Sequence, residues 1–162
     1  MTAKKTRGFT LIESILYFGL FAVIAGGGLA AAGGIIGTAA RSADRVAVAE
    51  EANFLSAKIG WLLTGFDEAA GGVTSPATGE SDVLEVRKPG IGVVRLEARG
   101  TDAVLTRANG APNTLNGSGV RVTSLRFLRS GPEAVTAQFT LSSSSAGPVV
   151  RQDFELTKYL LP

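Results

Sequence analysis

Hydrophobic and polar positions divide the chain into three stretches with different patterns. Residues 9–40 consist of apolar residues, glycines and a few hydroxyl side chains, and Glu13 is their only charge. Residues 41–66 combine charged positions with an apolar series at helical spacing, and residues 67–162 contain short runs in which apolar and polar residues alternate. About 20 apolar residues are enough to cross the hydrocarbon core of a bilayer, about 30 Å thick. The first stretch therefore predicts a membrane-spanning helix.

The second stretch predicts a helix that packs along one side. Its apolar positions recur at alternating intervals of four and three residues, which places them on one helical face: Val48, Ala52, Leu55, Ile59, Leu62 and Phe66. Gly65 suits the position just past such a helix, because glycine adopts the left-handed conformation at low cost. Trp61 could be an interface anchor, but on an amphipathic helix we expect it to pack against a sheet. A helix from Phe9 to about Leu63 would be roughly 80 Å long at about 1.5 Å per residue.

The third stretch predicts short β-strands. The short β-type runs are residues 83–87, 93–99, 103–106, 120–127, 135–141 and 150–156, and alternation is clearest in 93–99 and 135–141. Lys88-Pro89-Gly90 is a turn signal between the first two runs. The alternation changes parity between Val122 and Leu125, so we expect a β-bulge near Ser124. Residues 67–81, rich in Gly, Ala, Ser and Thr, are expected to form a loop. The predicted fold class is α+β, a long N-terminal helix packed on a small antiparallel sheet.

Charges on either side of the apolar stretch predict its orientation. Lys4, Lys5 and Arg7 precede it, whereas Arg41 is followed by the mixed charges of Asp44 and Arg45. Basic residues are concentrated on the cytoplasmic side of membrane helices, so the N-terminus is expected in the cytoplasm and the rest of the chain outside it. A secretory signal peptide carries a small-residue cleavage site after its apolar core. Here the suitably placed small residue, Gly8, precedes the apolar run.

The string Gly8-Phe9-Thr10-Leu11-Ile12-Glu13 in front of this run resembles the N-terminal motif of type IV prepilins and of the pseudopilins of type II secretion and DNA-uptake machines. The resemblance implies cleavage by a prepilin peptidase between Gly8 and Phe9 and N-methylation of Phe9. It also implies that Glu13 acts in assembly, its carboxylate pairing with the amine of Phe9 in its own or an adjoining chain. The alternative is that Glu13 only snorkels to the membrane interface.

The same resemblance implies a domain organisation and partners. The segments are a leader (1–8), a transmembrane and filament-core helix (9–40), an amphipathic helix half (41–66) and an antiparallel sheet part (67–162). The implied function is a structural subunit of a pilus-like filament, more similar to minor pilins and minor pseudopilins than to major ones. Implied partners are the prepilin peptidase, other pilin or pseudopilin subunits, an inner-membrane assembly platform and membrane lipid. The implied location is the inner membrane, as a single-pass protein, and then a pilus or pseudopilus. A membrane-anchored extracytoplasmic binding or sensor domain that does not polymerise remains the alternative.

Glycines in the membrane segment leave two functional interpretations open, beside the alternative that they only make a lipid-exposed segment flexible and have no role. Small residues at Gly26, Ala30 and Gly34, or at Gly33 and Gly37, would allow close packing of helices. Glycine also costs a helix interior about 1 kcal/mol relative to alanine, so the segment could instead be a place where the helix unwinds.

Composition offers little chemistry. The chain has no histidine and no cysteine, so it lacks the commonest general base, thiolate metal ligands and disulfides. We therefore assign no catalytic, cofactor-binding or metal-binding residue and do not expect an enzyme; residues 142–145 predict a hairpin loop. Asp67 with Glu68, or Asp153 with Glu155, would need further oxygen ligands to hold calcium.

The charge balance does not indicate a nucleic-acid partner. The formal net charge of +2 becomes −1 without Lys4, Lys5 and Arg7. Residues 67–162 carry ten acidic and ten basic side chains, so nucleic acid is not an expected partner.

Overall fold

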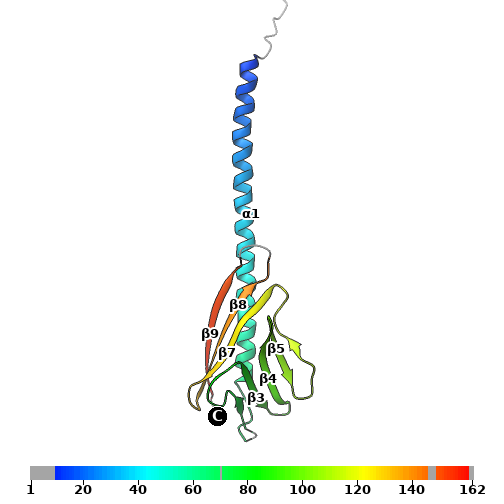
Figure 1. Ribbon diagram of the computed structural model, residues 1–162, viewed down its shortest axis with the longest axis vertical. Helices are drawn as coiled ribbons and strands as arrows, with labels where there is room; N and C mark the ends of the chain where they lie inside the picture. Colours follow the sequence, from blue (N-terminus) through cyan, green and yellow to red (C-terminus); the bar gives the residue numbers. More distant parts are fainter. Residues whose placement is uncertain (1–9, 70, 146–148, 161–162) are drawn as a thin grey trace, which may run out of the picture. The chain divides into compact units, whose positions relative to one another are not determined.

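The computed structural model describes residues 10–69, 71–145 and 149–160. Within these ranges one helix and nine strands follow one another along the chain (Figure 1): α1 (Leu11–Leu62), β1 (Val73–Ser75), β2 (Gly79–Ser81), β3 (Val83–Lys88), β4 (Gly92–Arg99), β5 (Asp102–Arg107), β6 (Asn113–Thr114), β7 (Val120–Arg129), β8 (Ala134–Ser143) and β9 (Arg151–Tyr159). The fold class is α+β, as the sequence predicts. The chain divides into two compact units, residues 1–40 and residues 41–162.

Helix α1 is 52 residues long and contains both predicted helical stretches. It ends at Leu62, one residue before the predicted end. Past it, Gly65 has a φ of 61°, the left-handed conformation expected of the residue that ends a helix. The hydroxyl of Thr64 donates a hydrogen bond of 2.8 Å to the Gly60 carbonyl and satisfies one of the last free carbonyls.

The amphipathic half of α1 supplies one wall of the hydrophobic core of residues 41–162. All five predicted helical positions are buried: Val48, Ala52, Leu55, Ile59 and Leu62. Phe66, beyond the helix end, is half-buried and packs against the same core. The opposing side chains come from both sheets and include Leu84, Leu96, Phe127 and Phe139. Burial of this face, at about 25 cal/mol per Å² of apolar surface, holds α1 to the strands.

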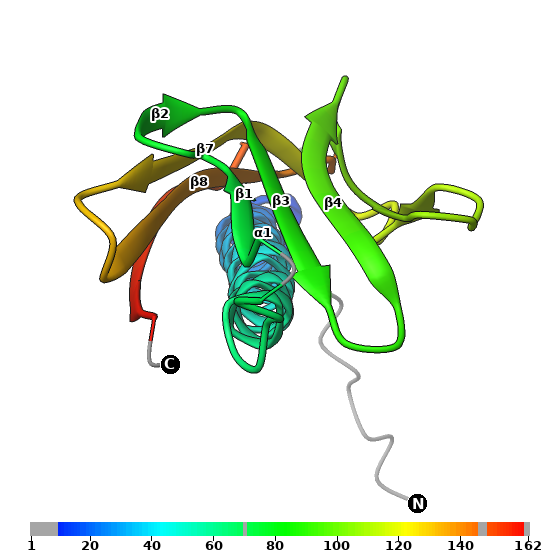
Figure 2. The same ribbon diagram turned by 90° about the horizontal axis from the view of Figure 1, so that it is seen from below.

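The strands form two antiparallel sheets, whereas the sequence predicted one. The five-stranded sheet has the order β1-β3-β4-β5-β6, and the four-stranded sheet has the order β2-β7-β8-β9. Figure 2 shows both sheets curving around one side of α1. The division begins in residues 67–81, where the prediction of a plain loop was wrong. There β1 pairs Val73 with Val86 of β3, and β2 pairs Glu80 with Leu128 of β7, so these two neighbouring strands join different sheets.

Local features of the longer strands agree with the sequence pattern more closely. The register of β7 against β8 shifts between Val122 and Ser124, which confirms the predicted bulge. Between β3 and β4, the Ile91 amide donates to the Lys88 carbonyl at 3.2 Å and Gly90 has a φ of 71°, as in a type II turn. Strand β8 continues to Ser143, so the predicted loop at residues 142–145 begins too early.

Candidate functional site

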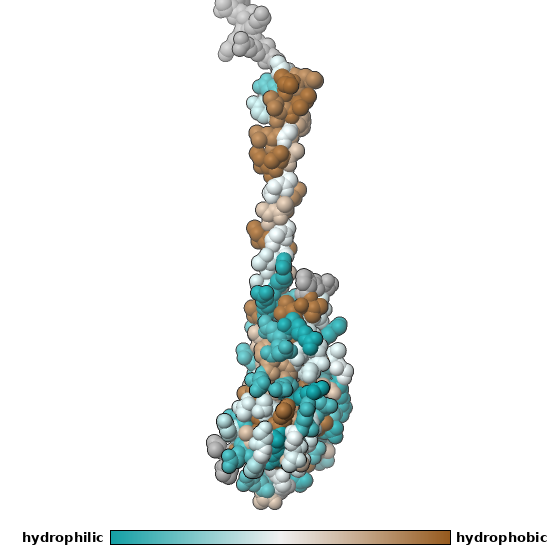
Figure 3. All heavy atoms as spheres, turned by 60° about the vertical axis from the view of Figure 1, so that its left-hand side comes forward, coloured by the Kyte–Doolittle hydropathy of each residue, from teal (hydrophilic) through white to brown (hydrophobic). Residues whose placement is uncertain are grey.

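The helical segment of residues 11–40 carries apolar side chains that nothing in its own unit covers. Leu11 is 83% exposed, Phe18 75% and Leu29 76%. An 18-residue window of α1 has a mean hydropathy of 2.0 and none of it is buried. Figure 3 shows apolar side chains spaced along this part of the helix. A core helix of a soluble domain would bury such residues, so the segment is consistent with a membrane anchor.

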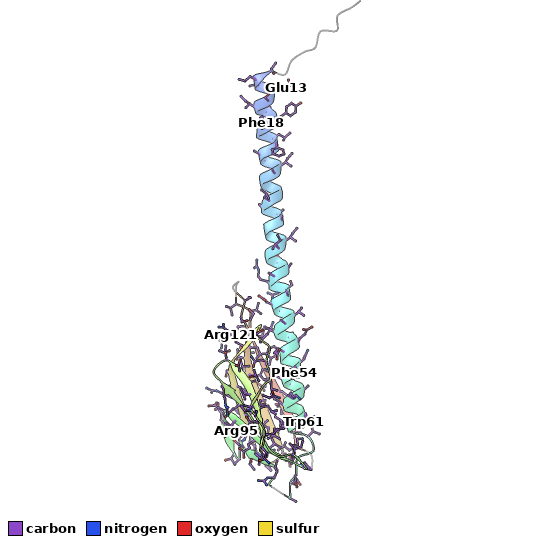
Figure 4. The ribbon with its side chains drawn as sticks, turned by 90° about the vertical axis from the view of Figure 1, so that its right-hand side faces the viewer. Glu13, Phe18, Phe54, Trp61, Arg95 and Arg121 are labelled. Carbon is purple, nitrogen blue, oxygen red and sulfur yellow. The ribbon has the colours of Figure 1, made fainter. Side chains whose placement is uncertain are left out.

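Glu13 lies in the first turn of α1 and is half-exposed (Figure 4). A negative charge in the first turn interacts favourably with the partial positive charge of a helix N-terminus. The turn is closed by the Ser14 amide, which donates to the Thr10 carbonyl at 3.2 Å. Gly8 and Phe9, the predicted cleavage and methylation residues, lie outside the described residues.

Two surfaces of the apolar segment have room for another helix. Ser14, Tyr17, Phe18 and Phe21 line a hollow of about 450 Å³ at the spacing of one helical face. Further along, a methyl group added at Gly26 or Gly34 would meet no atom within 4 Å, and the same holds for Gly19, Gly27, Gly28 and Gly33. Small side chains of this kind let two helix backbones approach closely.

Lys88 holds the C-terminal end of α1. Its side chain is inside the domain, with the residue only 5% exposed. The ammonium donates to the carbonyl of Trp61 at 2.6 Å and to the carbonyl of Thr64. The Trp61 carbonyl also accepts a long bond of 3.4 Å from the Thr64 amide. Carbonyls at a helix C-terminus carry partial negative charge, so a cation stabilises this helix end. Burial disfavours the charged ammonium and holds the pKa of Lys88 below the ordinary lysine value.

Aromatic residues occupy a side of α1 that the strands do not cover. Trp61 is 39% exposed and Phe54 43% exposed, so the prediction that Trp61 packs against a sheet was wrong (Figure 4). The ammonium of Lys58 lies 5.8 Å from the centre of the Phe54 ring and 5.6 Å from that of Trp61. The ammonium of Lys88 lies 4.8 Å from the Trp61 ring, and both distances to Trp61 are those of a cation–π contact.

A small charge network lies on the outer face of β4. Glu97 is bound at 2.7 Å by Arg95 and at 2.6 Å by Arg99, and only 13% of its side chain is exposed. Burial acts to raise the pKa of Glu97, but the hydrogen bonds and positive charges of Arg99 and Arg95 outweigh it and hold that pKa below the ordinary glutamate value. The network covers part of the sheet surface that α1 does not reach.

The acidic pairs considered for calcium make other contacts. Asp153 accepts a hydrogen bond of 2.6 Å from the Thr140 hydroxyl, and Glu155 accepts one of 3.2 Å from the Gln138 amide. They line a polar hollow of about 500 Å³ on the outer face of the four-stranded sheet. Within the described ranges, no group of three or more His, Cys, Asp or Glu side chains is placed to hold a metal ion. Asp67 contributes its backbone amide to the Arg87 carbonyl at 2.9 Å.

Two buried polar residues were missed at the sequence level, Lys88 and Asn116. Asn116, 9% exposed, accepts a hydrogen bond of 2.8 Å from the Ala103 amide and donates one of 2.8 Å to the Val120 carbonyl. It thereby joins the connection before β7 to β5. Neither residue has a local signal, because the partner carbonyl of Trp61 is 27 residues from Lys88 and Asn116 stands in a turn-rich stretch like several others.

The fold and the exposed helix together define a class of protein. This chain is an α+β protein of the general pilin-like architecture, with a single helix in the described ranges that is long and apolar enough to cross a membrane. Comparison with known protein families, with curated proteins and with solved structures finds no match for the chain.

Proposed function

We propose that this chain is a structural subunit, of the minor pilin or minor pseudopilin type, of a type IV pilus-like filament. In this proposal a prepilin peptidase removes residues 1–8, and the chain assembles through its N-terminal helix. One observation carries the proposal. The string from Gly8 to Glu13 leads into the first turn of a helix whose apolar side chains are exposed and which continues into a domain with its own core.

The exposed helix explains why such a subunit would leave the membrane only into a filament. Side chains such as Phe18 and Leu29 need an apolar surrounding, which either lipid or neighbouring helices supply. Between apolar helices, association depends on close packing, hydrogen bonds and lipid entropy. The open surface at Gly26 and Gly34 favours such packing.

Glu13 would set the register of assembly. A carboxylate costs about 2.5 to 3.5 kcal/mol at the centre of a membrane helix, and less near its end, where Glu13 lies. The amine created at Phe9 by cleavage would stand four residues away, about one helical turn, and its own or an adjoining chain could supply it. Two opposite charges about 4 Å apart attract by roughly 4 kcal/mol at an effective dielectric constant near 20. That attraction is large enough to favour one register over others.

Processing is the first test of this proposal. Mass analysis of the N-terminus, on protein extracted from membranes of cells that contain the peptidase, should find chains beginning at Phe9 with a methylated amine. Gly8→Leu should leave the leader in place, whereas the control Ala3→Leu should be cut normally. Recovery of uncut wild-type chains would contradict the proposal and favour an anchored binding or sensor domain.

Incorporation is the second test. Glu13→Val should leave membrane insertion and cleavage intact but reduce crosslinking into complexes with other pilin-like subunits at matched expression. Glu13→Asp, which keeps a carboxylate at the same position, is the matched control and should retain most of the crosslinking. Wild-type crosslinking of the Glu13→Val variant would mean that this carboxylate only snorkels to headgroups. Absence of any such complex with the wild-type chain would mean that the protein does not polymerise.

A further inference from the structure

Three arginines surround a pocket at the start of residues 41–162. Arg41 and Arg45 are four residues apart on α1 and therefore share a helical face. Arg151 is the first residue of β9. The pocket has a volume of about 490 Å³, and its lining comes from α1 and from the beginning of β9: Arg41, Arg45, Val149, Val150, Arg151 and Gln152.

Hydrogen bonds on both sides hold this pocket in shape. Asp44 of α1 accepts a bond of 2.7 Å from the Ser145 hydroxyl, which ties the end of β8 to the helix. The amide of Val150 donates to the Ser143 hydroxyl at 3.0 Å, and the Ser143 amide donates to the Val150 carbonyl at 2.8 Å. Ser143 itself is only 4% exposed. The start of β9, and Arg151 with it, is therefore fixed beside the helix.

The pocket carries an excess of positive charge. Its described lining contains three arginines and no acidic residue, and the acidic neighbours Asp44 and Asp153 accept hydroxyl hydrogen bonds from Ser145 and Thr140. Within the part of the chain that the structure describes, Arg45 and Arg151 make no side-chain hydrogen bond or ion pair. Their guanidinium groups can each present a fork of donors, the geometry that matches a phosphate.

The position of the pocket along the chain favours a membrane ligand. Residues 11–40 form thirty residues of continuous helix, or about 45 Å at about 1.5 Å per residue. A bilayer including its headgroup regions is about 40–45 Å thick. If α1 crosses a membrane, Arg41 and Arg45 come directly after the span, at the level of the headgroups. Val149, an apolar side chain that is 66% exposed, lines the same pocket and suits the boundary between headgroups and acyl chains.

We propose that this three-arginine pocket binds the phosphate of an anionic phospholipid headgroup on the side of the membrane where the domain lies. The inference rests on the membrane anchoring contained in the proposed function, but it does not require a filament. Bound lipid would fix the rotation of α1 and the height of the domain at the membrane surface. An acidic segment of a protein could also satisfy the charges, but the position next to the span and the exposed valine favour lipid.

Lipid binding to the full-length protein tests this directly. The protein, purified in a mild non-ionic detergent, is titrated separately with phosphatidylglycerol, phosphatidylcholine and inorganic phosphate, and bound molecules are counted by native mass spectrometry. Each basic residue near an anionic surface contributes about a five-fold factor. The double variant Arg45→Gln/Arg151→Gln should therefore bind phosphatidylglycerol roughly 30-fold more weakly. Arg151→Lys, which keeps the charge but loses the fork of donors, should bind more weakly than the wild-type chain and more tightly than Arg151→Gln.

The matched control is Arg87→Gln/Arg107→Gln, which removes the same charge from two exposed positions outside the pocket. It should bind phosphatidylglycerol as the wild-type chain does. Equal binding by the pocket variant, no preference over phosphatidylcholine, or equally tight binding of inorganic phosphate would each overturn the proposal. Unchanged lipid binding combined with loss of a protein partner in the pocket variant would assign the pocket to an acidic protein segment, which also overturns it.

Failure of this inference can be told apart from failure of the proposed function. Carbonate extraction of cell membranes reports anchoring, and N-terminal mass analysis reports cleavage after Gly8. A membrane-embedded, cleaved chain without lipid preference overturns only the pocket. An embedded, uncleaved chain that prefers phosphatidylglycerol supports the pocket and contradicts the filament subunit.

Discussion

A single lysine connects the five-stranded sheet to the end of α1. Lys88 closes β3 and gives its ammonium to the carbonyls of Trp61 and Thr64, so a strand residue caps a helix that ended 26 positions earlier. The stabilisation from capping is partly offset, because burial disfavours the charged ammonium and lowers the pKa of Lys88. Lys88 therefore does more than stabilise the domain, because its hydrogen bonds fix the position of the end of β3 relative to the end of α1.

Lys88→Met should lower stability at neutral pH by about 1 kcal/mol, because two helix carbonyls lose a charged donor while a buried charge is also removed. The pH dependence should change too. The folded-state pKa lies below the ordinary value of 10.5, so between these two values the unfolded chain binds more protons and wild-type stability rises with pH. That rise should be smaller in the variant. Thermal unfolding followed by circular dichroism from neutral pH to about pH 10.5 measures both effects.

The control for this experiment is Lys58→Met. Lys58 also lies over the Trp61 ring, at 5.6 Å, but it does not cap the helix. It should keep the wild-type slope between neutral and alkaline pH. Identical slopes in the wild-type and Lys88→Met chains would contradict the assigned role of burial.

Glu97→Gln should have its effect on the acid side. The folded-state pKa of Glu97 is lowered, so its contribution is present above the ordinary value of 4.5 and is lost as the pH falls through the folded-state pKa. The loss at neutral pH should be less than about 1 kcal/mol, because Arg95 and Arg99 are about half exposed. Urea unfolding at pH 7 and at a series of lower pH values should show a difference from wild type at pH 7 that shrinks as the pH falls below 4.5. Glu133→Gln, at an exposed position, should match wild type at every pH.

At the scale of elements, the two halves of α1 differ in whether their apolar side chains are buried within the chain. Residues 41–62 bury one face in the core, whereas residues 11–40 leave their apolar side chains exposed. The exposed half also contains all the glycines of α1 except Gly60, and glycine weakens a helix. A Cβ atom added at Gly26, Gly28 or Gly34 would have open space around it. A change in assembly caused by a larger side chain at these glycines would therefore report on contacts with other helices.

Leucine substitutions can separate the two interpretations of these glycines. Gly26→Leu and Gly28→Leu both strengthen the helix by roughly 1 kcal/mol, but only Gly26 belongs to the stripe with Ala30 and Gly34. If close packing matters, crosslinking into pilin-like complexes should fall for Gly26→Leu and stay normal for Gly28→Leu. If unwinding matters, both variants should assemble less. Normal assembly of both would leave the glycines without either role.

The elements also show which parts of the fold are readable from sequence. The buried face of α1 and the bulge near Ser124 can be predicted from the spacing of apolar residues alone. The first appears as a helical repeat, and the second appears as a break in the strand alternation. The split into two sheets does not, because β1 and β2 are three residues each and lie in a Gly- and Ser-rich stretch with no alternation. Their pairing with β3 and β7 depends on tertiary contacts that the local sequence does not encode.

The candidate sites divide in the same way. Glu13 can be recognised from the sequence alone, because it is the only charged residue in an apolar stretch. The three-arginine pocket joins Arg45 to Arg151, about a hundred residues later, and is therefore visible only once β9 lies beside α1. The sequence predicts only a turn at Lys88, and the capping of α1 by its side chain depends on a contact that the turn motif does not specify.

At the scale of the whole molecule, residues 41–162 hold a complete core. The residues of the core all belong to this unit, from Val48 of α1 to Leu141 of β8. A fragment of residues 41–162 should therefore fold as a soluble monomer, with mixed helix and strand in circular dichroism and one cooperative melt. Size-exclusion chromatography should give a monomer. An unfolded fragment would mean that residues 9–40 are needed for the fold.

The order of the elements also determines when this core can form. Val48 and Leu141 meet in the core although about ninety residues separate them along the chain. Synthesis proceeds from the N-terminus at about 5–20 residues per second, so the apolar face of α1 is complete roughly 5 to 20 s before β8 is made. During that time the nascent chain presents an uncovered helix face beside a membrane segment. The unfinished polypeptide, more than the folded domain, is thus the form that a chaperone must keep from aggregating.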